Sequence, residues 1–146
     1  VIAASGIMNG ADVAQALDAG AVAAQLGTAF LDTDESTADA AYRAALRTTQ
    51  SELPVLTRAI SGRAARCLNN RFVALGEELG PQNAPDYPVA YDMGKALNAA
   101  AKAAGETGFG AQWAGTGAAQ VRSGGAVEIL QAIASELDAA QSGGAP

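Results

Sequence analysis

Two short turns of small residues are the part of this sequence that most suggests chemistry. Ser5-Gly6 and Gly27-Thr28 each follow directly on an apolar run, and about one strand–helix unit separates the two glycines. Glycine allows the backbone to approach a ligand closely, and the exposed N–H groups of such a turn attract an anion. The pattern therefore predicts a phosphate-binding site, although a glycine at a strand end can equally serve only to make a tight turn.

The elements around the two turns predict how they meet. Residues 1–4 and 21–26 are apolar and strand-like, and residues 10–19 have helical spacing before a capping glycine, Gly20. Strand, helix and strand form a parallel βαβ unit, in which both turns lie at the same rim. A short helix beginning near Thr28 would point its N-terminus at the same place, where anions bind favourably.

The rest of the chain is predicted to be mostly helical. We expect a helix over 36–50 capped by Ser36 or Thr37, then a strand-like stretch over 55–60 and a helix over 61–79. A loop over 80–88 separates these from a helix over 89–104. A glycine-rich loop over 105–118 and an amphipathic helix over 125–140 complete the chain. Two strands cannot close a barrel, which needs about 250 residues, and they would leave an apolar edge exposed. We therefore expect the chain to be the end of a longer α/β protein.

Composition argues against several classes of function. The 146 residues carry a formal net charge of −6, which disfavours nucleic-acid binding, and no apolar run reaches the roughly 18 residues of a membrane span. Histidine is absent, which removes the commonest general base and metal ligand, and the single cysteine leaves no internal disulfide. The chain starts on an apolar run, without Met and without the charged start of a signal peptide, which suggests a fragment.

Other candidate sites have simpler structural interpretations. Asp32, Asp34 and Glu35 could form a metal cluster, but acids before a helix are also favoured by its positive N-terminus. Cys67 has neighbouring arginines that could lower its pKa, although a lone helical cysteine is more often inert. Trp113 lies in the glycine-rich loop, where packing in a core or lid is the default interpretation.

Four arginines, Arg58, Arg63, Arg66 and Arg71, could clamp a phosphate. In a helix that runs from residue 63, Arg63 and Arg66 share one face and Arg71 is rotated away from Arg66. The four side chains therefore do not converge on one anion, and we expect a solvated or ion-paired face.

A series of segments spans nearly the whole chain in a fixed order: ASGIMNG, GAVAAQLGTAFLDTDES, AYRAAL, LTRAISGRAARCLNNRFV, DYPVAYDMGKAL and QWAGTGAA. Together these segments resemble the nitronate monooxygenase family, formerly called 2-nitropropane dioxygenases. A single motif such as LGT is weak, but the ordered set is specific.

The resemblance implies a fold and a cofactor site. The fold is the C-terminal portion of a (βα)8 TIM barrel, its last strands and helices, with a helical excursion after the final strand. Residues 1–146 would belong to one FMN-binding domain. Gly6 matches the second glycine of the family's Gly-Gly-Ile turn after strand seven, and residues 25–28 match its segment after strand eight. By this resemblance, the phosphate end of a non-covalently bound FMN is held by Ser5, Gly6, Gln25, Leu26, Gly27 and Thr28.

Three positions depart from the family's pattern. Ser5 stands where a glycine is usual, and we expect phosphate binding to survive there if φ of Ser5 is negative. Ala29 replaces a frequent arginine, which puts any ion pair of that arginine in doubt. Thr116 replaces a glutamine close to Trp113, which weakens a polar role at position 116, whereas the resemblance suggests that Trp113 approaches the flavin or substrate pocket.

The implied activity is that of a cytoplasmic flavoprotein oxidoreductase that converts alkyl nitronates to carbonyl compounds and nitrite with oxygen. Its partners would be the small nitronate and oxygen, without nucleic acid or membrane, and the oligomeric state is left open. We expect no catalytic residue within 1–146, because the base and the isoalloxazine-facing residues would come from strands outside this chain. Two alternatives remain: an FMN-dependent enoyl-ACP reductase-like barrel, which would share the phosphate geometry, and a non-catalytic fragment or interaction module.

Overall fold

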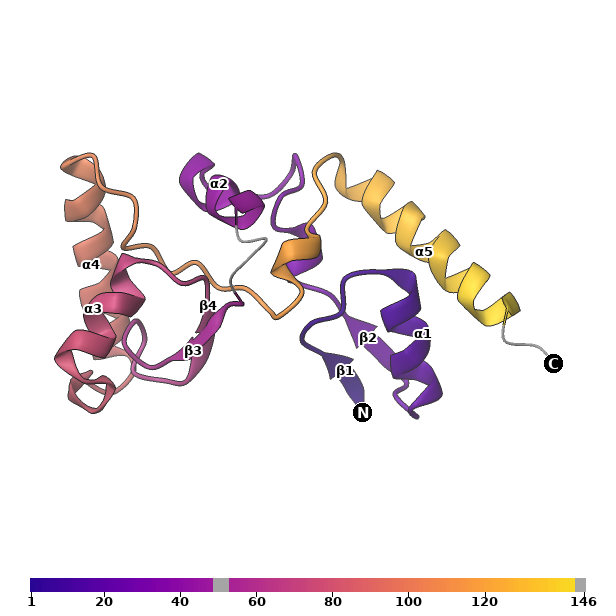
Figure 1. Cartoon of the computed structure of the whole chain (residues 1–146), viewed down its shortest axis with the longest axis horizontal. Helices are drawn as coiled ribbons and strands as arrows, with labels where there is room; N and C mark the ends of the chain where they lie inside the picture. Colours follow the sequence, from indigo (N-terminus) through magenta and orange to yellow (C-terminus); the bar gives the residue numbers. More distant parts are fainter. Residues whose placement is uncertain (49–52, 144–146) are drawn as a thin grey trace. The chain divides into compact units, whose positions relative to one another are not determined.

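A computed structural model of the chain describes residues 1–48 and 53–143 (Figure 1). The contacts divide the chain into two units. The first consists of the described residues of 1–50 and 115–146, and the second of those of 51–114. None of the helices in the described ranges has the length and apolarity needed to cross a bilayer.

The first unit begins with the predicted βαβ arrangement. Strand β1 (Ile2–Ala4) pairs with β2 (Ala23–Gln25) in parallel, in the register Ile2↔Ala23 and Ala4↔Gln25. Helix α1 (Gly10–Asp18) connects them, and it begins where the side chain of Asn9 accepts the N–H of Asp12 at 2.8 Å. The prediction of a parallel strand–helix–strand unit is therefore confirmed.

The two-stranded sheet of this unit is open. Ile2 is 62% exposed and Val22 is 77% exposed, although both side chains are apolar. We predicted an exposed apolar edge, and this is confirmed, but the buried character expected for a parallel strand is absent from β1. The reason is that β1 pairs only with β2, and no third described strand joins their sheet.

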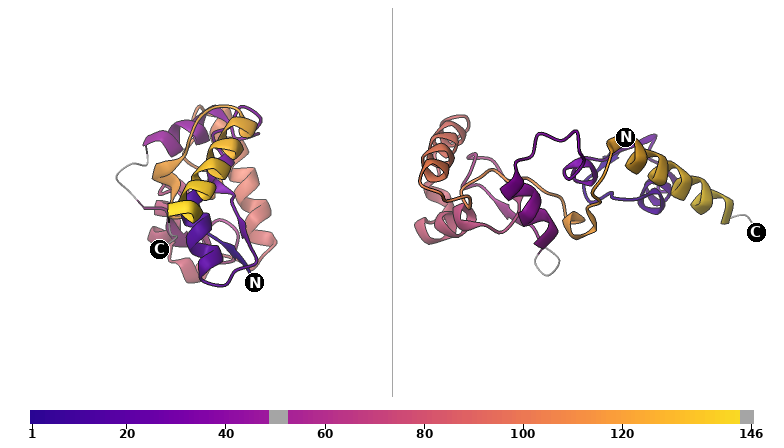
Figure 2. Two further views of the ribbon diagram at one scale, coloured as in Figure 1. Left: turned by 90° about the vertical axis from the view of Figure 1, so that its right-hand side faces the viewer. Right: turned by 90° about the horizontal axis from the view of Figure 1, so that it is seen from above.

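The core of the first unit lies between α1 and the last helix, α5 (Ala126–Gly143), which packs along α1 (Figure 2). Its buried apolar residues are Ile7, Val13, Ile129 and Ile133. This helix was predicted to be amphipathic with Val127, Ile129, Leu130, Ile133 and Leu137 as its apolar face, but Val127 and Leu130 are exposed.

The stretch after β2 forms two helices. A short 3-10 helix, η1 (Thr28–Phe30), begins at the predicted position, and α2 (Ala40–Thr48) follows. The predicted caps of α2 were wrong: Oδ1 of Asp39, rather than Ser36 or Thr37, accepts the N–H of Tyr42 at 2.8 Å. The predicted end of this helix at 49–50 lies outside the described residues.

The second unit contains an antiparallel strand pair and two helices. Strand β3 (Val55–Thr57) pairs with β4 (Ala65–Cys67), and α3 (Arg71–Leu79), a short 3-10 helix η3 (Pro81–Asn83) and α4 (Val89–Ala103) follow. Ile60, Cys67, Phe72 and Val73 form its buried core. Helix α4 agrees with the prediction. The expected loop over 105–118 is confirmed as far as residue 117, where the short 3-10 helix η4 (Ala118–Gln120) follows.

The predicted helix over 61–79 was wrong in its first half. Gly62 has φ +77°, which turns the chain back on itself, and Ala65–Cys67 then pairs with β3. The helix begins only at Arg71, because the side chain of Asn70 accepts the N–H of Val73 at 3.1 Å.

Candidate phosphate-binding site

The turn after β1 has an unusual backbone. Ser5 has φ +82° and Gly6 has φ +75°, so two consecutive residues lie in the left-handed region. The condition that we set for Ser5, a negative φ, is therefore not met. Ser5 takes the conformation that a glycine adopts without strain, which costs a serine about 1 kcal/mol. The backbone path of a glycine turn is kept at this position despite the side chain.

The turn after β2 is open to solvent. Gly27 has φ −118°, and its carbonyl oxygen accepts the N–H of Phe30 at 3.0 Å to begin η1. Gly27 is exposed, and a Cβ added to it would meet no atom within 4 Å. There is therefore room for a ligand directly beside this backbone.

The register of the sheet brings the two turns to the same edge. Ala4 lies opposite Gln25, and each strand ends at that pair, so Gly6 and Gly27 each lie two residues beyond it. Gln25 is exposed, whereas the side chain of Leu26 packs against the core that contains Ile7 and Val13. Leu26 can thus contribute to a site only through its backbone.

A third segment, Gly115–Gly117, closes on both turns. The N–H of Gly115 donates to Oγ1 of Thr28 at 2.9 Å. A Cβ on Gly115 would lie 3.2 Å from the backbone nitrogen of Gly6, and a Cβ on Gly6 would lie 2.8 Å from Oγ1 of Thr116. We did not predict this position for residues 115–117, whose only local signal was the density of glycine in residues 105–118.

Asp32 is a buried carboxylate of the first unit that joins helix α2 to Ser123. Its carboxylate is 1% exposed and accepts two hydrogen bonds from Arg47, at 2.8 and 2.9 Å, one from Arg43 at 3.5 Å and one from the hydroxyl of Ser123. The hydrogen bond from Arg47 is the main cause that lowers the pKa of Asp32, against the opposing effect of burial. Asp32 is therefore a charged structural anchor.

The neighbouring acids do not form a metal site. No cluster of metal-ligating side chains is found in the described ranges 1–48 and 53–143. The backbone N–H of Asp34 donates to the carbonyl of Gly124, and Oε2 of Glu35 accepts the N–H of Ala126 at 2.9 Å. Our expectation of an acid at a helix N-terminus holds for Glu35, but the helix is α5 and not α2.

Several hydrogen-bond donors at the turns are left for a ligand or water. Within the part of the chain that the structure describes, the backbone N–H groups of Gly6, Gly27 and Thr28 have no protein acceptor. The first N–H groups of a helical turn lack an intrahelical partner, which explains the donors of Gly27 and Thr28. Ser5, Gly6 and Thr116 line one hollow, whose lining includes none of residues 25–28, and Gly27 faces open space. Neutral donors at such positions suit an anion.

Comparison with known proteins identifies the family. The sequence profile described as nitronate monooxygenase matches residues 1–136. The chain belongs to the nitronate monooxygenase family. A nitronate monooxygenase of Paraburkholderia phytofirmans is 53% identical over 137 residues, and one of Pseudomonas aeruginosa is 47% identical over 137 residues. The matches cover 94% of this chain but only 37% and 39% of those relatives.

Solved structures also match this chain over part of their length. A nitroalkane oxidase from Streptomyces ansochromogenes superposes with a TM-score of 0.88 at 41% identity, and FabK from Thermotoga maritima with 0.77 at 28% identity. Each match covers 98% of this chain, and it covers 40% and 45% of the two structures. Both are TIM barrels, so the expected fold class is confirmed: this member of the nitronate monooxygenase family is α/β and forms a portion of a (βα)8 barrel.

The four arginines of this nitronate monooxygenase family member have separate partners in the second unit. Arg58 lies 4.0 Å from Asp86, Arg63 stacks on a tyrosine ring, Arg66 donates to a carbonyl and Arg71 pairs with Glu106. The prediction that they do not converge on one anion is confirmed. The helical face that we assigned to Arg63 and Arg66 was wrong, because Arg66 lies in β4.

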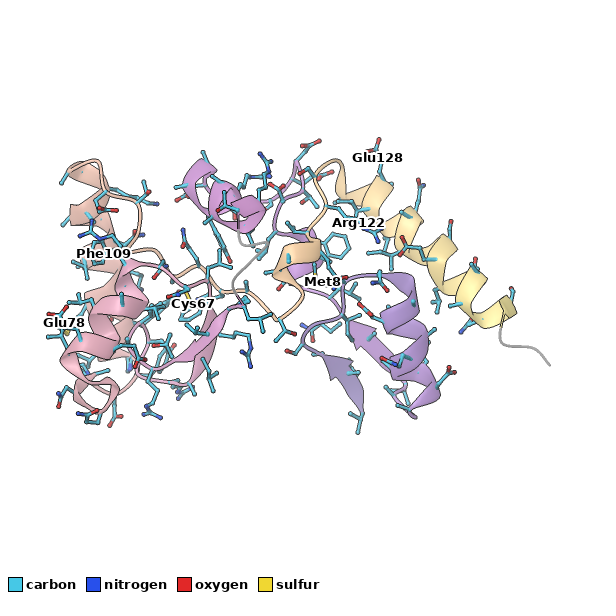
Figure 3. All side chains as sticks on the ribbon, viewed as in Figure 1. Met8, Cys67, Glu78, Phe109, Arg122 and Glu128 are labelled. Atoms are coloured by element: carbon cyan, nitrogen blue, oxygen red, sulfur yellow. The ribbon has the colours of Figure 1, made fainter. Side chains whose placement is uncertain are left out.

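Cys67 lies in the core of the second unit (Figure 3). Trp113 is partly buried and packs against the same core. Cys67 is fully buried, and burial raises the pKa of its thiol to about 11, against the lowering that neighbouring arginines could cause. Cys67 lies on β4 rather than on a helix, and its burial favours the inert thiol that we predicted. Core packing, the default interpretation of Trp113, is confirmed, and an approach of Trp113 to a flavin stays a prediction.

Proposed function

We propose that this chain is part of a longer FMN-dependent nitronate monooxygenase, an oxidoreductase that oxidises alkyl nitronates to carbonyl compounds and nitrite with oxygen. In this proposal the chain holds the phosphate end of FMN at Ser5, Gly6, Gln25, Leu26, Gly27 and Thr28. The observation that carries the proposal is the pair of strand-end turns, Ser5-Gly6 and Gly27-Thr28, which the parallel register of β1 and β2 places at one edge.

The residues present fit a phosphate group. Gly27 faces open space, and unpartnered N–H groups of Gly6, Gly27 and Thr28 are available as donors. A phosphate monoester has oxygens that accept several hydrogen bonds, and backbone N–H groups at glycine turns are common partners for it. The acid in the adjoining hollow, Asp12, is engaged by the N–H of Met8 at 2.9 Å.

The cradle holds its anion with neutral groups. Ala29, at the place of a frequent arginine in the family, is 2% exposed and lies in η1. No lysine or arginine is among the residues that line the hollow beside Ser5 and Gly6. Binding would therefore rest on hydrogen bonds from the backbone and from hydroxyl groups rather than on an ion pair.

The positions of these residues indicate which part of the reaction FMN carries out and which part this chain supports. When bound, FMN supplies the redox chemistry of the oxidation. The residues of this chain bind the phosphate and orient the cofactor, and the hydrogen bond from Gly115 to Thr28 holds the segment Gly115–Gly117 against the turns. We propose no catalytic residue among 1–146, and the residues that face the flavin ring and the nitronate would come from the rest of the protein.

The experiment uses the whole protein that contains this chain. The purified protein is denatured, and the released chromophore is identified by absorbance and chromatography. The native protein is then assayed for oxygen consumption and nitrite formation with an alkyl nitronate, and for NAD(P)H-driven reduction of an enoyl thioester. The proposal expects FMN, oxygen uptake and nitrite. Release of no FMN would overturn the cofactor, and enoyl reduction without nitronate oxidation would favour the reductase alternative.

A further inference from the structure

Thr116 has glycine on both sides, and both glycines lie against the Ser5-Gly6 turn. A Cβ on Gly115 would lie 3.2 Å from the nitrogen of Gly6, and a Cβ on Gly117 would lie 3.1 Å from its carbonyl oxygen and 2.2 Å from Cγ of Met8. Contacts this close leave no room for a side chain at position 115 or 117. Thr116 is therefore the residue of Gly115–Gly117 whose side chain lies at the turn.

The hydroxyl of Thr116 lies directly over Gly6. A Cβ built on Gly6 would be only 2.8 Å from Oγ1 of Thr116, so the hydroxyl occupies the position beside the α-carbon. Thr116 is exposed, and its hydroxyl makes no hydrogen bond with any residue of 1–48 or 53–143. With Ser5, Gly6 and Gln15, it lines a hollow that opens to solvent. The hydroxyl is thus free to donate to a ligand at the turn.

The segment that carries Thr116 is held in place on both sides. Before it, the N–H of Gly115 donates to Thr28 in the second turn. After it, the N–H of Ala118 donates to the carbonyl of Gly115 at 3.1 Å, and the N–H of Gln120 donates to that of Gly117 at 2.8 Å. A donor on a segment that is already fixed loses little entropy on binding, which favours its use in recognition.

We propose that Thr116 is a further binding residue for the cofactor, whose hydroxyl donates a hydrogen bond to a phosphate oxygen held at the Ser5-Gly6 turn. The inference rests on the proposed function, since it assigns a third contributor to the same site. The ligand class is a phosphate monoester dianion. A hydrogen bond from a hydroxyl to such a charged oxygen is stronger than one to a neutral acceptor. Thr116 would therefore favour the phosphorylated flavin over riboflavin, which lacks the phosphate.

The test compares two flavins on the apo form of the whole protein. Dissociation constants for FMN and for riboflavin are measured by flavin fluorescence quenching with the wild type, Thr116→Val, Thr116→Ser and Thr37→Val. Valine keeps the shape and removes the hydroxyl, and serine keeps the hydroxyl. Thr37 is an exposed threonine of the same unit without an assigned role, and it serves as the matched control.

We expect Thr116→Val to weaken FMN binding about tenfold, the usual effect of one hydrogen bond to a charged group, and to leave riboflavin binding unchanged. Thr116→Ser and Thr37→Val should bind FMN as the wild type does. Equal FMN affinity of Thr116→Val and the wild type would overturn the inference, and so would an equal loss for both flavins. A wild type that binds neither flavin would instead overturn the proposed function, so the two failures are distinguishable.

Discussion

The backbone N–H of Gly115 donates a hydrogen bond to the hydroxyl oxygen of Thr28, with 2.9 Å between the two atoms and 87 positions between the residues. This bond joins the turn after β2 to the segment that also lies against Gly6. The candidate site is therefore built from three separate stretches of chain. Its geometry depends on tertiary contacts as well as on the two strand-end turns.

Replacing Thr28 by valine tests that bond. The variant keeps the shape of the side chain but leaves the N–H of Gly115 without its acceptor. We expect the free energy of unfolding in urea to fall by about 1 kcal/mol relative to the wild type. Thr28→Ser retains the hydroxyl and is the control. Equal unfolding midpoints for the valine and serine variants would show that the bond contributes nothing.

Gly10→Ala tests the packing of α1 on α5. A Cβ at position 10 would lie 2.2 Å from the nitrogen of Leu137 and 2.4 Å from the carbonyl oxygen of Ile133, and both are backbone atoms that cannot move alone. The substitution would also disturb the hydrogen bond from the N–H of Gly10 to Glu136 at 2.9 Å. We expect a loss of about 3 kcal/mol in the free energy of unfolding.

The matched control for Gly10→Ala is Gly143→Ala. A Cβ at position 143 meets nothing within 4 Å, and the residue ends α5. Its stability should equal that of the wild type within about 0.5 kcal/mol. If Gly10→Ala were as stable as Gly143→Ala, the close backbone approach of the two helices would be wrong.

Asp32→Asn should change the pH dependence of stability. The pKa of Asp32 in the folded chain lies below its unfolded value, first because of the hydrogen bond from Arg47. A lowered pKa means that the carboxylate stabilises the fold above the unfolded pKa of about 3.9 and stops doing so as pH falls through the folded pKa. We expect Asp32→Asn to cost on the order of 2 kcal/mol between about pH 5 and 8. This difference from the wild type should shrink below about pH 4, and a difference that does not depend on pH would contradict the account.

Cys67 should be unreactive in the native protein. Its pKa of about 11 leaves very little thiolate near neutral pH, and the residue is fully buried. We expect alkylation of Cys67 at about pH 8, followed by peptide mass spectrometry, to be at least about a hundredfold slower in the native protein than in denaturant. Similar rates in the two conditions would mean that this strand is open to solvent.

The βαβ unit could be predicted from the sequence because its signals are local. Two apolar runs, a helical spacing between them and a glycine after each run are all properties of neighbouring residues. Strand β4 was missed because Ala65–Cys67 contains Arg66 and becomes a strand only by pairing with Val55–Thr57. The start of α3 had a local signal in Asn70, a preferred capping residue, that the helical interpretation of residues 61–79 overlooked.

The site was predictable only in part, for the same physical reason. The turns at Gly6 and Gly27 follow from strand ends and glycine. The position of Thr116 over Gly6 depends on a tertiary approach between residues distant in the chain, which no local pattern encodes. The positive φ of Ser5 was also not foreseen, because serine rarely adopts it and only the surrounding turn imposes it.

If the turn at Gly27 binds the phosphate of FMN, as we propose, Gly27→Ala should weaken that binding without changing the fold. The added methyl group would meet no protein atom within 4 Å, and the φ of −118° suits alanine, so the fold should be unaffected. The methyl group would occupy the space in which we propose that the phosphate binds. The dissociation constants of FMN and riboflavin are measured on the apo form of the whole protein. We expect Gly27→Ala to weaken FMN binding at least about tenfold, with an unchanged unfolding midpoint and unchanged riboflavin binding. Unchanged FMN affinity in this variant would show that the phosphate does not lie at Gly27.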